Sequence, residues 1–198
     1  MNKIEKIIIG TNNTGKYREI CNLLPKSITK YSPKDFGILS PEETGASFKK
    51  NSLIKASYFS KKTNLICLSD DSGLEVELLN GAPGIYSSRW SGEKNDFNFA
   101  IKKIFKEMRN ASKDWKKRNA AKFTCCMTLF WPNGKSHCSK GEIKGKISYS
   151  KKGNNGFGYD PIFIPDGHDK TFSEMKPQKK MSIDHRFEAF KKIKHFFI

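Results

Sequence analysis

The sequence has no hydrophobic run long enough to cross a bilayer. The N-terminal segment MNKIEKIIIG has too short an apolar run for a secretory signal peptide. No other stretch approaches the roughly 20 apolar residues of a membrane-spanning helix. These absences lead us to expect a cytoplasmic protein with no membrane partner.

Cysteine is present in a pattern that excludes two common frameworks. The five cysteines are odd in number, show no C-x-x-C spacing and include an adjacent pair, Cys125 and Cys126. Neither a disulfide framework nor a zinc ribbon is indicated. A reducing compartment is the natural setting for such a chain.

Arginine is scarce in a chain whose formal net charge is +17, since only five of its 37 basic residues are arginines. A basic surface attracts phosphate chains through counterion release. However, bidentate phosphate or base contacts more often use arginine. The lysines are also scattered along the sequence, with small clusters only at 113–118 and 176–180. We therefore expect no dedicated nucleic-acid partner, although the positive field would attract a small polyanion such as a nucleotide.

Segments typical of strands and helices alternate along the chain, which predicts one α/β domain over residues 1–198. Hydrophobic spacing predicts strands at residues 6–9, 65–68, 120–131, 136–144 and 162–164. It predicts helices at residues 16–24, 47–61 and 96–109, and a last helix that begins near Ser182 as its N-cap.

Two adjacent carboxylates, Asp70 and Asp71, follow the apolar run 65–68 and precede Ser72 and Gly73. If the run is a buried strand, we expect both carboxylates where that strand leaves the core. Carboxylates in such a place bind hard cations or transfer protons. The same four residues also make a good Asx-turn, so a purely structural role stays open.

The loop GTNNTGK at residues 10–16 matches the phosphate-binding P-loop until Tyr17, which replaces the Ser or Thr that coordinates Mg²⁺. That difference argues against P-loop ATPase machinery. The backbone amides, Thr11, Asn13 and Lys16 remain suited to binding phosphate at a helix N-terminus. The alternative is a polar turn that only caps the helix.

A second acidic turn, PEETG at residues 41–45, precedes the next predicted helix. A carboxylate of Glu43 would join Asp71 as a metal ligand if the two segments meet. Acidic residues at a helix N-terminus are also ordinary, because they interact favourably with the helix dipole. Lys55 on that helix is either a phosphate contact or a solvated lysine.

The glycine-rich segment GNNGFGYDPIF at residues 153–163 permits close backbone approach, and Phe157 offers a flat face for stacking a base. A rigid connector with core aromatic residues is the alternative. Lys180, His185 and Arg186 form a donor-rich patch suited to a carbonyl-bearing base or to phosphate.

Seven motifs stand in this order: TNNTGK at 11–16, EETG at 42–45, FKKN at 48–51 with KA at 55–56, DDSGL at 70–74, GAPG at 81–84 with YSSR at 86–89, GFGYDP at 156–161, and HR at 185–186. Together they resemble the non-canonical purine nucleoside triphosphate pyrophosphatases, also called inosine or xanthosine triphosphate pyrophosphatases, from about residue 7 to 189. Two positions depart from the family pattern. Ser52 replaces the usual Ala, and Asp184 replaces the usual Ser.

The resemblance implies an elongated mixed β-sheet with flanking helices, two lobes that enclose a cleft, and a homodimer. It also implies hydrolysis of ITP, dITP and XTP to the monophosphate and pyrophosphate with Mg²⁺. Asp71 would be the general base and a Mg²⁺ ligand, Glu43 the second metal ligand, and Asp70 their support. Phosphates would be held by Thr11, Asn12, Asn13, Thr14, Gly15, Lys16, Lys55 and Ser72. The base would be enclosed by Phe157, Gly158, Tyr159, Asp160, Lys180, His185 and Arg186.

Two alternatives stay open beside this hypothesis. A related pyrophosphatase of Maf-like type would act on other nucleotides. A basic nucleic-acid-binding protein would bind DNA or RNA in a salt-sensitive way, show no turnover, and be indifferent to Asp71→Asn.

Overall fold

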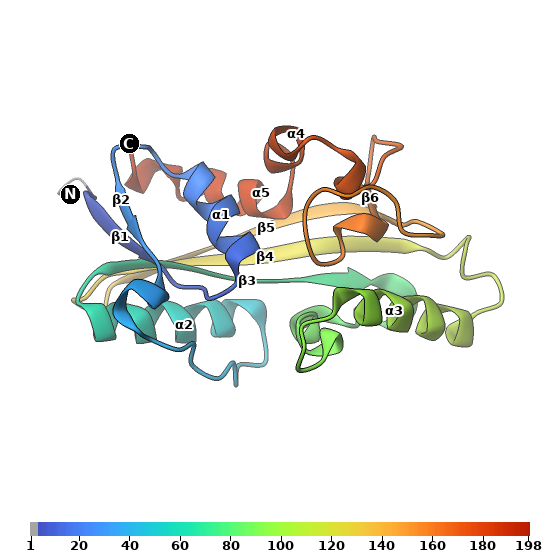
Figure 1. Ribbon diagram of the computed structural model, residues 1–198, viewed down its shortest axis with the longest axis horizontal. Coiled ribbons are helices and arrows are strands. Elements are labelled where there is room, and N and C mark those ends of the chain that lie inside the picture. Colours follow the sequence, from blue (N-terminus) through green and yellow to red (C-terminus); the bar gives the residue numbers. More distant parts are fainter. Residues whose placement is uncertain (1–3) are drawn as a thin grey trace. The chain divides into compact units, whose positions relative to one another are not determined.

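The computed structural model describes residues 4–198 and contains one mixed sheet with strand order β2-β1-β3-β4-β5-β6 (Figure 1). The strands are β1 (Lys6–Ile9), β2 (Thr29–Tyr31), β3 (Ile66–Val76), β4 (Ala120–Phe130), β5 (Ser136–Ile147) and β6 (Phe163–Pro165). β1 runs parallel to both β2 and β3, whereas β6 runs antiparallel to β5. The predicted α/β class with a mixed sheet and flanking helices is confirmed.

The helices are α1 (Thr14–Leu23), α2 (Phe48–Thr63), α3 (Phe97–Ala111), α4 (Pro177–Met181) and α5 (His185–Lys191). The three long ones begin and end within two residues of the predicted bounds. Each has a side-chain N-cap, supplied by Asn13, Ser47 and Asp96 respectively. Within residues 4–198, no helix combines the length and hydrophobicity that a membrane span requires.

The prediction that the strand leaves the core at Asp70 and Asp71 is wrong, because β3 continues through the DDSG sequence to Val76. β3 lies between β1 and β4 in the sheet, and Leu74 and Val76 are fully buried. Pairing and burial override the turn preference of Asp, Ser and Gly. The Asx-turn alternative is therefore excluded.

The predicted start of the last helix is also wrong. Ser182 ends α4, and its backbone N–H donates to the carbonyls of Gln178 and Lys179. Pro177, at the first position of α4, has a fixed φ that starts this short helix. The following helix, α5, begins only at His185.

The chain divides into two compact units. Unit 1 comprises the chain up to Asp71 together with residues 125–141 and 185–198, and unit 2 comprises residues 72–124 and 142–184. In unit 1, Ile7 and Ile9 pack in one apolar cluster with α1 and α5, while Ile8 packs in another with Phe59 of α2. Alternate side chains of β1 thus face opposite sides of the sheet, each covered by a helix (Figure 1).

Unit 2 has its own aromatic core. The ring of Phe163 lies 4.7 Å from that of Phe123 and 5.2 Å from that of Phe172, measured between centroids. Ile101, Ile104 and other buried side chains of α3 belong to the same cluster.

Candidate active site

The loop between β1 and α1 is fixed against β3 by close packing. A Cβ at position 10 would lie 2.8 Å from the sulfur of Cys67 and 2.9 Å from the ring of Phe59, so only glycine fits. The Ser69 hydroxyl donates to the carbonyl of Gly10 at 2.7 Å. The loop is therefore held beside the residue that precedes Asp70.

This loop places Thr11, Asn12, Asn13, Thr14, Gly15 and Lys16 at the N-terminal end of α1. Asn13 Oδ1 accepts from the Lys16 backbone N–H at 3.0 Å, and the Thr11 hydroxyl accepts from the Asn13 N–H at 3.2 Å. The turn thus caps the helix, as the structural alternative predicted. The cap uses only one of the first amides of α1, and the others lie at the positive end of the helix, where anions bind.

Asp70 lies in a buried network of alternating charges in unit 1. Its side chain is fully buried, and its Oδ2 lies 3.3 Å from Lys16 Nζ and 3.3 Å from Arg186 Nε. Arg186 Nη1 in turn lies 2.9 Å from Glu19 Oε2 and 3.2 Å from His185 Nε2. Two cations and two carboxylates therefore compensate one another, which buried charges require. The network ties Lys16, at the start of α1, to the strand that carries Asp70 and Asp71.

Asp71 lies in a second cluster of unit 1, formed with α2 and the turn before it. Asn51 Nδ2 donates to Asp71 Oδ2 at 3.1 Å, and Lys55 Nζ lies 3.8 Å from Asp71 Oδ1. Lys55 also forms an ion pair with Glu43. The backbone N–H of Gly45 donates to Asn51 Oδ1 at 2.8 Å, which orients the amide toward Asp71. The segment that carries Glu43 and the strand that carries Asp71 therefore do meet, as a shared metal site requires.

Burial and the paired charges shift the pKa values of this cluster. Burial raises the pKa of Asp71 above that of an ordinary aspartate, and the positive charges of Lys55 and Lys16 offset only part of that effect. Burial alone would lower the pKa of Lys55, but the carboxylates of Asp71 and Glu43 outweigh it and raise that pKa. Lys55 therefore stays cationic, and Asp71 is a stronger base than an exposed aspartate.

The donor set around Lys55 fits Mg²⁺. Within residues 4–198, no three or more His, Cys, Asp or Glu side chains are grouped as a preformed metal cage. However, Glu43 and Asp71 both form ion pairs with the Lys55 ammonium, so two carboxylates lie close to one position that holds a positive charge. Mg²⁺ commonly takes one or two carboxylates and completes its shell with water and substrate phosphates. These two residues therefore fit the predicted metal site.

In unit 2, the glycine-rich segment is folded around Asp160. The Asp160 carboxylate accepts from the Phe157 backbone N–H at 2.9 Å and from Lys180 Nζ at 2.6 Å. A Cβ at Gly156 would lie 2.1 Å from Asp160 Oδ2, and its φ of +75° also favours glycine. Lys180 Nζ lies 5.0 Å from the centroid of the half-buried Phe157 ring. A buried cation therefore lies next to the Phe157 ring.

The other predicted site residues are distributed between the units. Tyr159 is 2% exposed, donates to the Ser87 carbonyl at 2.9 Å and has its pKa raised by burial, so it is part of the core of unit 2. Gly158 and Ser72 are half-buried in unit 2. His185 and Arg186 are buried in unit 1.

Sequence analysis missed two residues of the site. Glu19, three positions after Lys16 on α1, holds Arg186, although the residues lie 167 positions apart in the sequence. The sequence gives only a weak indication of this role for Glu19, since a single acidic residue on an amphipathic helix is usually solvated. Asn51 was noticed within the FKKN motif but was given no role.

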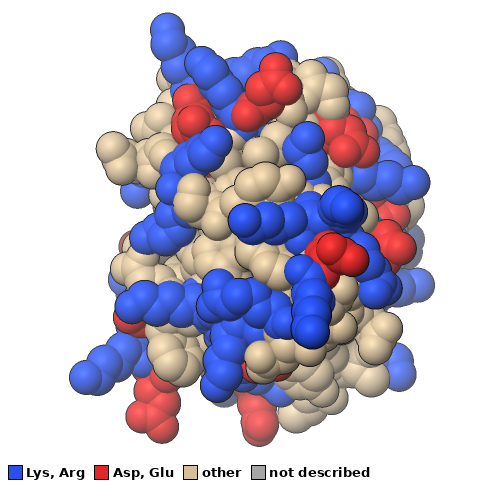
Figure 2. Space-filling model, turned by 90° about the vertical axis from the view of Figure 1, so that its right-hand side faces the viewer, with Lys and Arg blue, Asp and Glu red and all other residues tan. Residues whose placement is uncertain are grey.

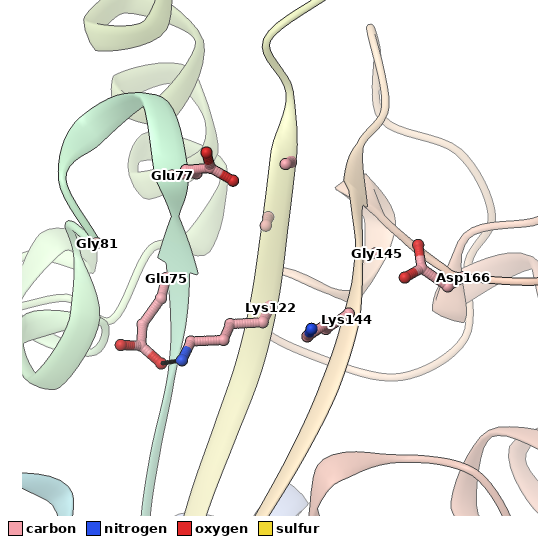
Figure 3. A pocket seen from close by; sticks show the side chains of 9 residues that line it. Glu75, Glu77, Gly81, Lys122, Lys144, Gly145 and Asp166 are labelled. Carbon is pink, nitrogen blue, oxygen red and sulfur yellow. Dashed lines mark ion pairs between the residues drawn. The ribbon is translucent and has the colours of Figure 1, made fainter.

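A separate pocket of about 400 Å³ lies in unit 2 and contains none of the predicted site residues. Lys122 lies 3.6 Å from Glu75 within it, and Lys144 and Asp166 line its other side (Figure 3). The charges in this pocket are mixed and partly paired. The buried charge clusters around Asp70 and Asp71 remain the stronger candidate site.

Comparisons with known proteins identify the family of the chain. A model of the Ham1 family matches residues 7–196. The chain is 41% identical to a dITP/XTP pyrophosphatase of Zymomonas mobilis, over 95% of this chain and 90% of the relative. It is 40% identical to one of Caulobacter vibrioides, over 96% of both chains. A solved Ham1 protein from Coxiella burnetii superposes with a TM-score of 0.86 at 34% identity, over 97% of this chain and 98% of that one. The chain belongs to the Ham1 family.

Proposed function

We propose that this protein hydrolyses ITP, dITP and XTP to the monophosphate and pyrophosphate, and so removes non-canonical purine nucleotides from the nucleotide pool. The observation that carries the proposal is the buried Asp71 carboxylate, held by Asn51 and facing Lys55. Relatives that align with nearly the whole chain are named dITP/XTP pyrophosphatases, which supports dITP and XTP as substrates.

The chemistry assigned to Asp71 is proton removal from the attacking water. The water oxygen bonds to the α-phosphorus, its proton passes to Asp71, and the bond from the α-phosphorus to the α–β bridging oxygen breaks. Pyrophosphate leaves with that oxygen. The raised pKa of Asp71 suits this role, because a general base works best when its pKa approaches the operating pH.

Mg²⁺, held by Asp71 and Glu43, would neutralise charge on the phosphates when bound. Lys55 supplies a permanent positive charge beside Asp71, and its raised pKa keeps that charge in place. Lys16 and the amides of the first turn of α1 supply further stabilisation for the phosphates. The ion pair with Asp70 limits where the Lys16 ammonium can lie.

Base selection is assigned to Phe157 for stacking and to Lys180 as a donor. A donor aimed at a 6-oxo group would be left unpaired by the amino group of adenine, which a polar site penalises strongly. Arg186 forms ion pairs with Glu19 and Asp70, and its contact with the base is proposed from the family resemblance. By family resemblance, we also propose a homodimer and a cytoplasmic location.

The test is pyrophosphate release with Mg²⁺ from ITP, dITP, XTP, ATP, GTP and dTTP. We expect turnover of the first three, and a loss of about 10²- to 10⁴-fold for Asp71→Asn, the range that a general base supplies. Asp166→Asn is the matched control, because it neutralises an exposed carboxylate outside the site. Turnover retained in Asp71→Asn would assign the base elsewhere.

The same panel separates the alternatives. Preferential turnover of dTTP or of another standard nucleotide would favour the Maf-like hypothesis. No turnover of any nucleotide, with salt-sensitive binding to DNA or RNA, would favour a nucleic-acid-binding protein without this activity.

A further inference from the structure

The net positive charge is concentrated in two segments of unit 2, residues 97–119 and 146–152. They contain 11 of the 37 basic residues but only two of the 20 acidic ones, for a net charge of +9 of the total +17. These 30 residues, under a sixth of the chain, therefore carry more than half of its net charge. A lysine-rich composition spread evenly along the chain would not produce this asymmetry.

The fold places the two segments together. Asn119 and Ile147 exchange two hydrogen bonds, each of 2.8 Å. The rings of Trp115 and Tyr149 pack edge-on with centroids 6.0 Å apart. The exposed surface of residues 97–119 and 146–152 is called the basic face below.

Nearly all of the charges on the basic face are available to a partner. Ten of its eleven basic side chains are exposed: Lys102, Lys106, Arg109, Lys113, Lys116, Lys117, Arg118, Lys146, Lys151 and Lys152. The side of the molecule on which the loop after α3 lies shows Lys and Arg in large excess over Asp and Glu (Figure 2). Lysine spacing along the sequence alone did not reveal this grouping, because α3 and the end of β5 are distant in the sequence.

An exposed aromatic ring lies among these lysines. Tyr149 is 60% exposed, and the Lys116 ammonium lies 5.5 Å from its centroid. Positive side chains that follow a phosphate backbone, combined with aromatic rings on which bases stack, are typical of surfaces that bind single-stranded nucleic acid. Only two of the eleven basic residues are arginines, which disfavours bidentate recognition of particular bases.

We propose that the basic face binds single-stranded nucleic acid without sequence specificity, through its phosphates and through stacking of a base on Tyr149. An anionic membrane would attract the same lysines, but stable insertion needs several apolar side chains. In these two segments, the large hydrophobic side chains that are exposed are Phe99 and Tyr149. The proposal is independent of the pyrophosphatase chemistry, which uses other residues.

The test is fluorescence anisotropy of a labelled 20-nucleotide oligo(dT) or oligo(U), titrated with the wild type at 50 to 300 mM KCl. The face variant replaces four exposed lysines by glutamine: Lys116, Lys117, Lys151 and Lys152. The control variant replaces four exposed lysines of unit 1: Lys26, Lys34, Lys61 and Lys62. Both variants lose the same net charge, so only the position of the charge differs.

We expect the face variant to bind at least about tenfold more weakly at 50 mM KCl. The slope of log K against log salt should decrease in magnitude by about 3, because each of the four lost phosphate contacts contributes roughly 0.7 on a single strand. The control variant should lose much less. Tyr149→Ser should weaken binding about fivefold or more with little change in slope, because stacking is not ionic. The thermal midpoints of all variants are measured by circular dichroism to confirm folding.

Three results would overturn the proposal. One is no binding by the wild type at 50 mM KCl. Another is equal weakening in the face and control variants, which would indicate a general charge effect. The third is binding to phosphatidylglycerol vesicles but not to the oligonucleotides, which would assign the face to a membrane surface. If the face variant fails to fold, Tyr149→Ser and the wild-type salt dependence still decide the question.

Discussion

The adjacent carboxylates Asp70 and Asp71 should differ sharply in their effect on stability. Asp70→Asn removes a fully buried charge that lies 3.3 Å from both Lys16 and Arg186. Removing one partner of a buried ion pair costs about 3–5 kcal/mol, because the remaining charge is left uncompensated. At about 2–4 °C per kcal/mol for a chain of this size, the thermal midpoint should fall by roughly 6–20 °C.

Asp71→Asn should change stability by no more than about 1 kcal/mol, because asparagine keeps the shape of the side chain and the variant no longer buries a carboxylate charge. Lys55 retains its ion pair with Glu43. The raised pKa of Asp71 means that the folded state disfavours its charged form. As the pH rises from about 4, the unfolded chain therefore loses this proton first, and the wild type loses stability relative to the Asn variant. Below about pH 4, where the carboxyl is protonated in both states, that difference should disappear.

The measurement is thermal unfolding followed by circular dichroism in EDTA, at pH values from 4 to 7, for the wild type and both variants. We expect Asp70→Asn to be the less stable variant throughout. The thermal midpoint of Asp71→Asn should rise relative to that of the wild type as the pH rises. Equal destabilisation by the two substitutions, or a pH trend of the opposite sign, would refute the separate roles assigned to the two carboxylates.

Three further predictions concern other parts of unit 1. Ser52→Ala should destabilise the fold by about 1–2 kcal/mol, because it removes a buried 2.7 Å hydrogen bond to the Thr128 hydroxyl; a double variant with Thr128→Val should recover part of the loss in urea unfolding. Hydrogen bonding with Cys126 lowers the pKa of Cys138, so iodoacetamide should modify Cys138 at a lower pH than Cys21, whose pKa is raised by burial; mass spectrometry would distinguish the two sites. EDTA should abolish pyrophosphate release and Mg²⁺ should restore it, with a higher Mg²⁺ requirement in Glu43→Gln; turnover that survives EDTA would exclude a metal-dependent reaction.

The fold could be predicted from the sequence where apolar spacing and a local cap agree. α3 is an example, because Asp96 caps it and its buried residues recur at Ile101, Ile104 and Met108. The last helices were placed less well because Ser182 resembles an N-cap, yet it makes the closing hydrogen bonds of α4. A short-range signal cannot decide between the start of one helix and the end of another when both are short.

The site could be predicted only where its residues lie close together in the sequence. The loop from residue 10 to 16 and the DDSG segment both gave local signals. By contrast, the ion pair between Glu19 and Arg186 joins two helices from opposite ends of the chain. Neither residue has a neighbour in the sequence that reveals the pairing, since it exists only after α1 and α5 pack on the same face of the sheet (Figure 1).

The continuation of β3 through Asp70 and Asp71 explains why two neighbouring carboxylates can have separate roles. In a turn, Asp70 and Asp71 would share one environment and repel each other. In an extended strand, successive side chains point to opposite faces of the sheet. Asp70 therefore meets Lys16 of α1 and Arg186 of α5, whereas Asp71 meets Asn51 and Lys55 of α2. The sheet thus separates a carboxylate that pairs with Lys16 at the start of α1 from one that is suited to accept a proton, although one peptide bond joins them.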